Sequence, residues 1–101
     1  MNYEQKIKTM VDDKPQYEFA IKQFARLLTD RDALQALVDE QGFTYRAGDL
    51  IKPNPAVGQL REVQKQLLTF YSRFGLTSRD ERLLEKEQEE DTDLSEFSDL
   101  E

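Results

Sequence analysis

Two stripes of apolar residues at helical spacing constrain the fold of this chain more than any other feature. The first stripe runs from Tyr17 to Val38 with gaps of three and four residues, which mark one face of a long amphipathic helix. The second runs from Val57 to Phe74 with the same spacing and predicts a second long helix. Because each stripe needs an apolar partner, we expect an all-α fold built on a long antiparallel helical hairpin.

The residues that flank these stripes mark where the two helices begin and end. Pro15 suits the first turn of the first helix, where a missing N–H costs no hydrogen bond, and Gly42 suits its C-terminal cap. Asn54 and Pro55 provide an N-cap and a proline at the first position of the second helix, which ends at Gly75. Local signals therefore predict the boundaries of both long helices.

Shorter helices are expected on either side of the helical hairpin. Thr77 with Asp80 forms a variant of the capping box, and Ser78 with Glu81 is an equally good alternative. Either pair predicts that a third helix begins there. Near the start of the chain, apolar residues at helical spacing predict a short N-terminal helix, lined by Tyr3, Ile7, Met10 and Val11.

The connector between the two long helices has a different pattern. Phe43, Tyr45, Leu50 and Ile51 flank the turn sequence Ala-Gly-Asp at 47–49. This pattern predicts a short β-hairpin or an ordered loop. An isolated β-hairpin of this length is only marginally stable in water, so we expect the helices to support it.

Arg31 interrupts the first apolar stripe one heptad after Phe24. One interpretation is that its side chain snorkels out of the seam between two helices and keeps its charge in water. The other interpretation is that it pairs with a carboxylate and sets the register across an interface.

Charge divides the chain into a nearly neutral body and an acidic tail. Residues 1–84 carry thirteen Lys and Arg against twelve Asp and Glu, whereas residues 85–101 carry one Lys against nine acids. The tail therefore supplies −8 and the body +1 of the net charge of −7. We divide the chain into a short N-terminal segment or helix (1–14), a helical oligomerisation domain (15–84) and the acidic tail, which we expect to be disordered.

Three apolar residues recur at regular spacing within the acidic tail. Leu94, Phe97 and Leu100 follow one another every three residues among acidic side chains. A segment of this kind can become a short amphipathic helix in a groove on a partner protein. The alternative is a solubilising tail whose charges only repel one another.

The composition excludes most catalytic chemistry. The chain has no Cys and no His, which excludes disulfides, zinc fingers, thiol nucleophiles and every mechanism that needs an imidazole. Its four glycines are scattered, and no phosphate-cradling loop is present. No apolar run approaches the roughly 20 residues that span a bilayer, so a soluble, cytoplasmic protein is expected. We expect no enzymatic activity, no catalytic residue, no metal site and no cofactor.

The unequal lengths of the two predicted helices suggest that one copy of the chain is not enough. The first, over residues 15–41, is about 40 Å long, and the second, over residues 56–74, is about 28 Å long. The unmatched length and the aromatic residues of the second stripe predict an interface between copies. The residues assigned to this interface are Tyr17, Ile21, Phe24, Leu28, Leu60, Leu67, Phe70, Tyr71 and Phe74. The alternative is that the N-terminal and third helices fold back and cover these side chains.

Two motifs around the second helix carry a resemblance to a known family. The connector ends in Ile-Lys-Pro-Asn-Pro-Ala at 51–56, and the helix closes with Phe-Gly-Leu-Thr-Ser-Arg-Asp at 74–80. In this order and at this separation, the motifs resemble those of phage terminase small subunits, and the likeness covers about two thirds of the chain. Ser78 stands where the family usually has proline, and Glu81 stands near the position of a family arginine.

The resemblance implies a division of labour in viral genome packaging. Small subunits of this family form homo-oligomeric rings, recognise double-stranded viral DNA and regulate the large subunit, which supplies the ATPase and the nuclease. For this chain the resemblance implies no catalysis, and it implies other copies of the chain, the large subunit and viral DNA as partners in the host cytoplasm. The acidic tail is then expected to dock on the large subunit or to shield basic surface from nucleic acid.

Lysine and arginine residues are the candidates for the DNA contact because they neutralise phosphates. They gather near the N-terminus and around Gly75, and they are Lys6, Lys8, Lys14, Lys22, Arg73, Arg79 and Arg82. A ring repeats each of them by symmetry, and the alternative is that each is an ordinary solvated position. The rival function is an acidic helical protein–protein adaptor or inhibitor that does not bind DNA, and DNA retention distinguishes the two.

Overall fold

A computed structural model describes residues 2–85 of the chain. The elements follow one another as α1 (Tyr3–Met10), the 3-10 turn η1 (Pro15–Tyr17), α2 (Glu18–Gln41), β1 (Thr44–Ala47), β2 (Leu50–Pro53), α3 (Pro55–Arg73) and α4 (Ser78–Leu83). The acidic tail from residue 86 on, with Leu94, Phe97 and Leu100, lies outside the described residues, so its disorder and its partner contact stay predictions.

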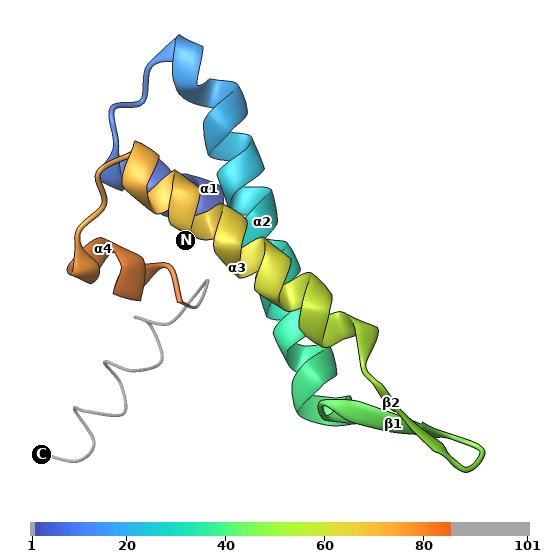
Figure 1. Cartoon of the computed structure of the whole chain (residues 1–101). Helices are drawn as coiled ribbons and strands as arrows, with labels where there is room; N and C mark the ends of the chain where they lie inside the picture. Colours follow the sequence, from blue (N-terminus) through green and yellow to red (C-terminus); the bar gives the residue numbers. More distant parts are fainter. Residues whose placement is uncertain (1, 86–101) are drawn as a thin grey trace, which may run out of the picture.

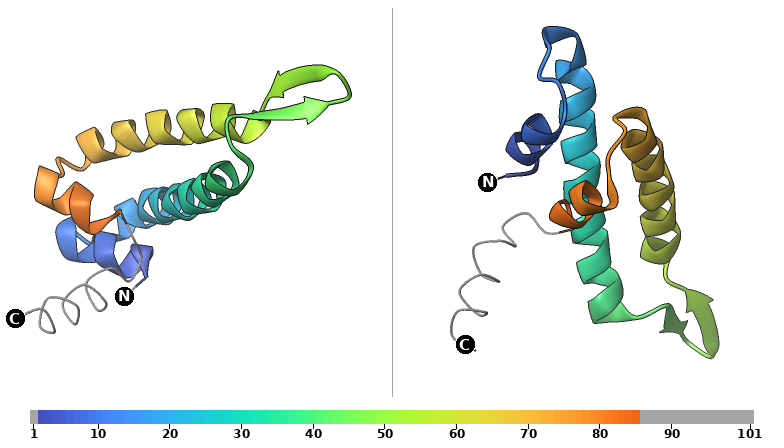
Figure 2. Two further views of the ribbon diagram at one scale, coloured as in Figure 1. Left: turned by 90° about the horizontal axis from the view of Figure 1, so that it is seen from below. Right: turned by 90° about the vertical axis from the view of Figure 1, so that its left-hand side faces the viewer.

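The two long helices α2 and α3 run antiparallel and lie side by side (Figure 1). This arrangement confirms the predicted helical hairpin, although the first helix opens with the 3-10 turn η1 before α2 begins. The short helix α1 packs against α2, and α4 lies at the same end of the helical hairpin (Figure 2). The β-hairpin occupies the opposite end.

The core is centred on a cluster of aromatic rings between α2 and α3. Phe24 is fully buried, and its ring stacks on Phe70 and Phe74 at centroid distances of 5.3 and 5.9 Å. Tyr71 meets the same ring edge-on at 5.6 Å. Offset and edge-to-face pairs add about 0.5–1.5 kcal/mol each beyond the burial of apolar area. The rings therefore hold the two long helices together.

Eight of the nine residues predicted at an interface between copies belong to this core within the single chain, and Leu60 belongs to a second cluster with Val38 and Ala56. Five of the nine, Ile21, Phe24, Leu28, Leu60 and Leu67, are buried. The other four pack against the core and are partly buried, namely Tyr17, Phe70, Tyr71 and Phe74. Side chains of α1 and the residue that follows α4 join the same cluster. The chain thus covers these side chains itself, as the alternative interpretation expected.

Three predicted helix caps are present in the structure. Gly42 ends α2 with a φ of 82°, a backbone conformation that glycine adopts without strain. The Asn54 side chain accepts a hydrogen bond from the N–H of Ala56 at 3.0 Å and donates one to the carbonyl of Gly42 at 2.8 Å. Thr77 and Asp80 form the capping box of α4, which decides between the two predicted starts.

The connector folds as an antiparallel β-hairpin, one of the two predicted outcomes. Tyr45 pairs with Lys52, and Ala47 pairs with Leu50 across a two-residue turn. Gly48 has a φ of 65° at the first position of this turn, where a type II′ turn requires it. The strands are exposed except at Ala47, which is half-buried, and they project past the helices (Figure 1). The expected support by the helices is therefore wrong for the strands, because only the base of the β-hairpin is held.

Replacing Phe24 by alanine leaves a cavity at the centre of the ring cluster. We expect F24A to lower the free energy of unfolding by about 3–5 kcal/mol. F19A is the matched control, because the Phe19 side chain is 75% exposed, and it should change stability by less than about 0.5 kcal/mol. Urea unfolding of both variants measures the difference, and equal losses would contradict this description of the core.

Candidate nucleic-acid interface

A largely buried arginine joins the elements that carry the candidate DNA-binding cations. The guanidinium of Arg31 donates hydrogen bonds to Oδ1 of Asp32 at 2.9 and 3.0 Å, and to Oη of Tyr3 at 3.0 Å. It also donates to the backbone carbonyls of Leu84 and Glu85, both at 2.8 Å. One side chain of α2 thereby reaches both α1 and the end of α4.

Lys6 reinforces this contact from α1. Lys6 is 4% exposed, and its ammonium donates a hydrogen bond to the carbonyl of Leu83 at 3.1 Å. The last carbonyls of a helix have no partner within it and carry partial negative charge, so cations are favourable there. We call Lys6 and Arg31, together with the carbonyls of residues 83–85, the carbonyl latch.

The surroundings of Arg31 and of its partner Tyr3 fix the protonation of both side chains. Burial, and then the hydrogen bond to Asp32, raise the pKa of Tyr3 well above its usual value. Burial lowers the pKa of Arg31, but the hydrogen bond and the charge of Asp32 outweigh this effect and raise it. Tyr3 therefore stays protonated and donates its O–H to Asp32, while Arg31 stays charged at neutral pH.

This geometry decides between the two interpretations of Arg31. Its side chain is only 14% exposed, so it does not snorkel into solvent. It pairs with the carboxylate of Asp32, as the second interpretation expected, but both groups belong to the same chain. The hydrogen bonds of this pair to Tyr3 and to the carbonyls of Leu84 and Glu85 hold α1 and α4 on α2 within one copy.

The candidate cations outside the carbonyl latch lie on elements at the end of the molecule opposite the β-hairpin (Figure 1). They are Lys8 on α1, Lys14 before η1, Lys22 on α2, Arg73 at the end of α3, and Arg79 and Arg82 on α4. The fold therefore brings cations from both ends of the described chain to the same end of the molecule.

Ion pairing divides these cations into two groups. Lys14 lies 3.9 Å from Asp12, and Lys22 lies 3.3 Å from Glu18, all at exposed positions. Exposed pairs of this kind contribute little and are screened by salt. Among residues 2–85, no ion pair is formed by the remaining four, which we call the unpaired cations: Lys8, Arg73, Arg79 and Arg82.

The structure removes Lys6 from the surface that DNA can reach. Its ammonium is buried in the carbonyl latch, where it contacts the end of α4. This role could not be read from the sequence, because Leu83, whose carbonyl Lys6 binds, lies 77 residues further along the chain. No local pattern around Lys6 signals such a contact.

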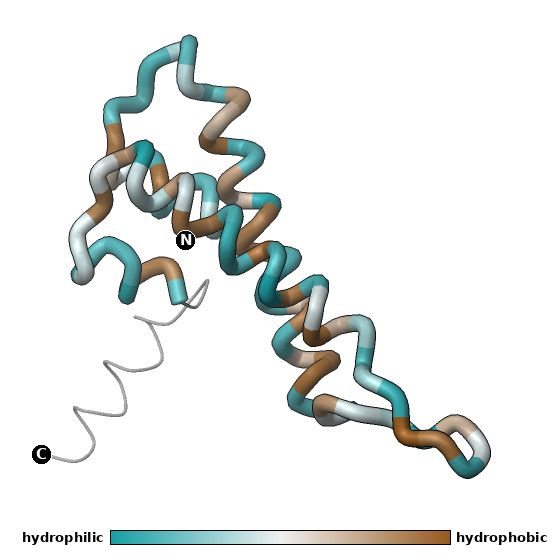
Figure 3. Tube along the Cα trace, viewed as in Figure 1, coloured by the Kyte–Doolittle hydropathy of each residue, from teal (hydrophilic) through white to brown (hydrophobic). Residues whose placement is uncertain are grey.

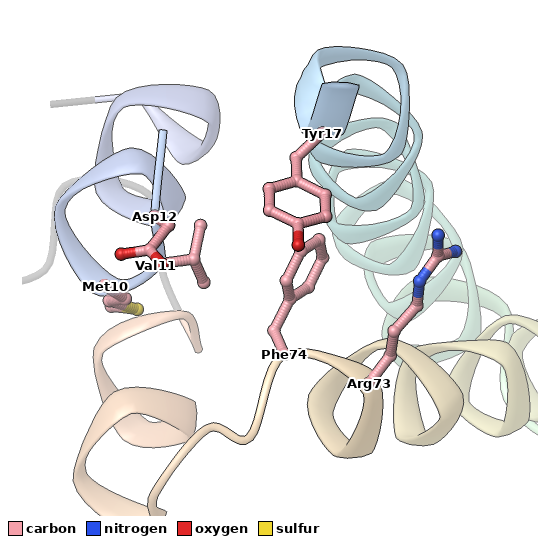
Figure 4. A pocket seen from close by; sticks show the side chains of 6 residues that line it. All are labelled: Met10, Val11, Asp12, Tyr17, Arg73 and Phe74. Atoms are coloured by element: carbon pink, nitrogen blue, oxygen red, sulfur yellow. The ribbon is translucent and has the colours of Figure 1, made fainter. Parts of the chain in front are cut away.

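A pocket of about 470 Å³ opens between the end of α1 and the end of α3 (Figure 4). It is lined by Met10, Val11, Asp12, Tyr17, Arg73 and Phe74. The carboxylate of Asp12 repels a phosphate, and the described part of the chain has no cluster of three or more Asp, Glu, His or Cys suited to a metal ion. We assign no ligand to this pocket.

Comparison with known proteins identifies a family for the chain. The family model for the small subunit of phage terminase matches residues 3–91, a range that includes every helix and strand described above. No curated protein and no solved structure matches the chain. Over residues 2–85, no helix is long and apolar enough to cross a membrane.

Replacing Arg31 by alanine leaves the carbonyls of Leu84 and Glu85 without this donor, and leaves the carboxylate of Asp32 with the hydrogen bond from Tyr3. Hydrogen bonds to a charged group contribute about 1.5–3 kcal/mol each, so R31A should lower the free energy of unfolding by at least that amount. R26A is the matched control, because Arg26 is 82% exposed and pairs with Asp30 only at 3.9 Å.

The R26A control should lose no more than about 0.5 kcal/mol. Urea unfolding at one protein concentration compares the two variants. A loss in R31A no larger than that in R26A would show that the carbonyl latch does not stabilise the fold.

Proposed function

Because the chain belongs to the phage terminase small-subunit family, we propose that it forms a ring that binds viral DNA and regulates the large terminase subunit. The family gives the chain a role in viral DNA packaging and no catalytic role. In this proposal the ATPase and nuclease activities belong to the large subunit, and the complex acts in the host cytoplasm.

The observation that supports the DNA contact is the set of unpaired cations at one end of the molecule. Arg73, Arg79 and Arg82 are exposed, and Lys8 is half-buried. The carbonyl latch holds α1 and α4 on α2, so these charges keep fixed positions relative to one another. One copy offers few phosphate contacts, but a closed ring repeats each cation and adds their contributions.

Apolar side chains that the single chain leaves in water support a contact between copies. Leu37 on α2 is 41% exposed, and Leu68 on α3 is 63% exposed. Burial of such side chains is the dominant favourable contribution in most protein–protein association. In the proposed ring, Leu37 and Leu68 contact the neighbouring copy. The core residues that the sequence pattern predicts at the interface are not part of this contact.

The acidic tail is the proposed contact with the large subunit. Leu94, Phe97 and Leu100 supply three apolar side chains among acids, the composition of a segment that folds in a groove on a partner. Deletion of residues 91–101 should then weaken binding to the large subunit in a pull-down with the full-length chain as reference. If the tail instead shields basic surface, the same deletion should strengthen DNA binding, and no change in either would contradict both roles.

The DNA contact is tested by the double variant R79A/R82A. It should bind a double-stranded DNA fragment more weakly, and its plot of log K against log salt should flatten by about 0.9 for each phosphate that is no longer neutralised. R61A/K65A removes two exposed cations from α3, outside the proposed set, and is the matched control.

Fluorescence anisotropy at several salt concentrations measures both affinity and slope. Equal effects of the two double variants would contradict the proposed surface. Absence of DNA binding by the unaltered protein at low salt would favour the adaptor function instead.

A further inference from the structure

The β-hairpin leaves an unusual amount of apolar side chain in water. Phe43, Leu50 and Ile51 are 72%, 63% and 70% exposed, and Tyr45 is 45% exposed. Figure 3 shows the apolar stretch of this β-hairpin, which we call the arm, projecting beyond the helices. An isolated two-stranded hairpin is at best marginally stable, and each large apolar side chain left in water forgoes the favourable free energy of burial. These features indicate a surface that is completed by a partner.

The strand register places a cation beside an apolar side chain on each face of the β-hairpin. Lys52 is the cross-strand partner of Tyr45, and Ile51 is the partner of Arg46. Cross-strand partners point to the same face, and successive residues alternate between faces. Within the described residues, neither cation forms an ion pair. The partner surface must therefore offer both apolar contacts and negative charge.

The last turns of α2 present a surface with these properties. Leu37 is 41% exposed, and the exposed carboxylate of Glu40 lies three residues on, on the same face of the helix. Asp39 is also exposed and precedes Glu40. The last turn of α2 contains no basic residue, so both acids lie at the negative end of the helix dipole, where they are unfavourable. Asp39 accepts a hydrogen bond from Gln35, but no cation within residues 2–85 pairs with either acid.

The two surfaces do not meet within one copy. The β-hairpin leaves the end of α2 and projects past both long helices (Figure 2), and its cations do not pair with the acids of the same chain over residues 2–85. A second copy can bring the acidic end of its α2 to the β-hairpin of the first copy. This one contact then neutralises both the cations of the β-hairpin and the acids of α2. The contact is head-to-tail, because different surfaces of the two copies meet, and such contacts close into rings when the rotation fits.

We propose that the β-hairpin of one copy docks on the C-terminal turns of α2 of the next copy through the face that carries Tyr45, Leu50 and Lys52. Lys52 faces Glu40 in this contact, and Arg46 and Asp39 add charge of the same two signs around it. Leu37 lies beneath Tyr45 and Leu50 of that face. This inference rests on the proposed ring and names the surfaces that build it. DNA is a poorer occupant of the arm, because phosphates neutralise its cations but give no burial to Phe43, Leu50 and Ile51.

Charge reversal on either surface tests the contact. R46E/K52E and D39K/E40K should each shift the full-length protein from the oligomer toward the 11.9 kDa protomer, measured by light scattering after size exclusion. The quadruple variant with all four changes restores opposite charges and should recover the oligomer. An equimolar mixture of the two double variants should also assemble. When the two variants alternate, each contact joins either two unaltered surfaces or two reversed surfaces, and both kinds of contact carry opposite charges.

R79E/R82E is the matched control, since it makes the same change in charge at the end of the molecule opposite the β-hairpin. Its native mass should equal that of the unaltered protein. Circular dichroism of every variant should match, because all of the altered side chains are exposed.

Distinct outcomes separate this inference from the proposed function. If the unaltered protein is oligomeric and R46E/K52E leaves its mass unchanged, or if the quadruple variant does not recover the oligomer, the docking contact is wrong and the ring remains. If R46E/K52E lowers DNA retention while the mass is unchanged, the arm contacts DNA and the inference is overturned. A monomeric unaltered protein would overturn both the ring and the contact.

Discussion

The arrangement of the short helices depends on the guanidinium of Arg31. Aromatic packing around Phe24 joins the two long helices, but it does not determine where a six-residue helix such as α4 sits. The hydrogen bonds from Arg31 to the carbonyls of Leu84 and Glu85, together with the buried side chain of Leu84, hold α4 in position. The bond to Tyr3, whose ring is buried in the core, holds α1 beside it. Without the arginine, the carbonyls of Leu84 and Glu85 lose this donor, and the unpaired cations lose their fixed spacing.

The molecule separates two kinds of surface along the helical hairpin. One end is closed by the carbonyl latch and displays cations drawn from α1, α3 and α4. The other end carries the β-hairpin, whose base is fixed by Asn54 and whose strands remain exposed. In the proposed ring, the proposed contact between copies lies at one end of the molecule and the proposed contact with DNA at the other. This separation lets assembly proceed without covering the cations.

Local patterns in the sequence predicted the long helices, the β-hairpin as one of two outcomes, and the caps at Gly42, Asn54 and Thr77, because each depends on residues close together in the chain. Contacts between distant residues were not predictable in this way. Lys6 was assigned to DNA because a lysine near the N-terminus resembles any exposed cation, whereas its partner is a backbone carbonyl that no sequence pattern marks. The interface residues were assigned from periodicity, which marks an apolar face but not what covers it.

The native mass of the unaltered protein at physiological salt tests the central claim most directly, because the proposed DNA contact and the proposed arm contact both require more than one copy. We predict a single species whose mass is a whole-number multiple of 11.9 kDa, with several copies in a closed assembly. A stable species of 11.9 kDa across micromolar concentrations would contradict this claim.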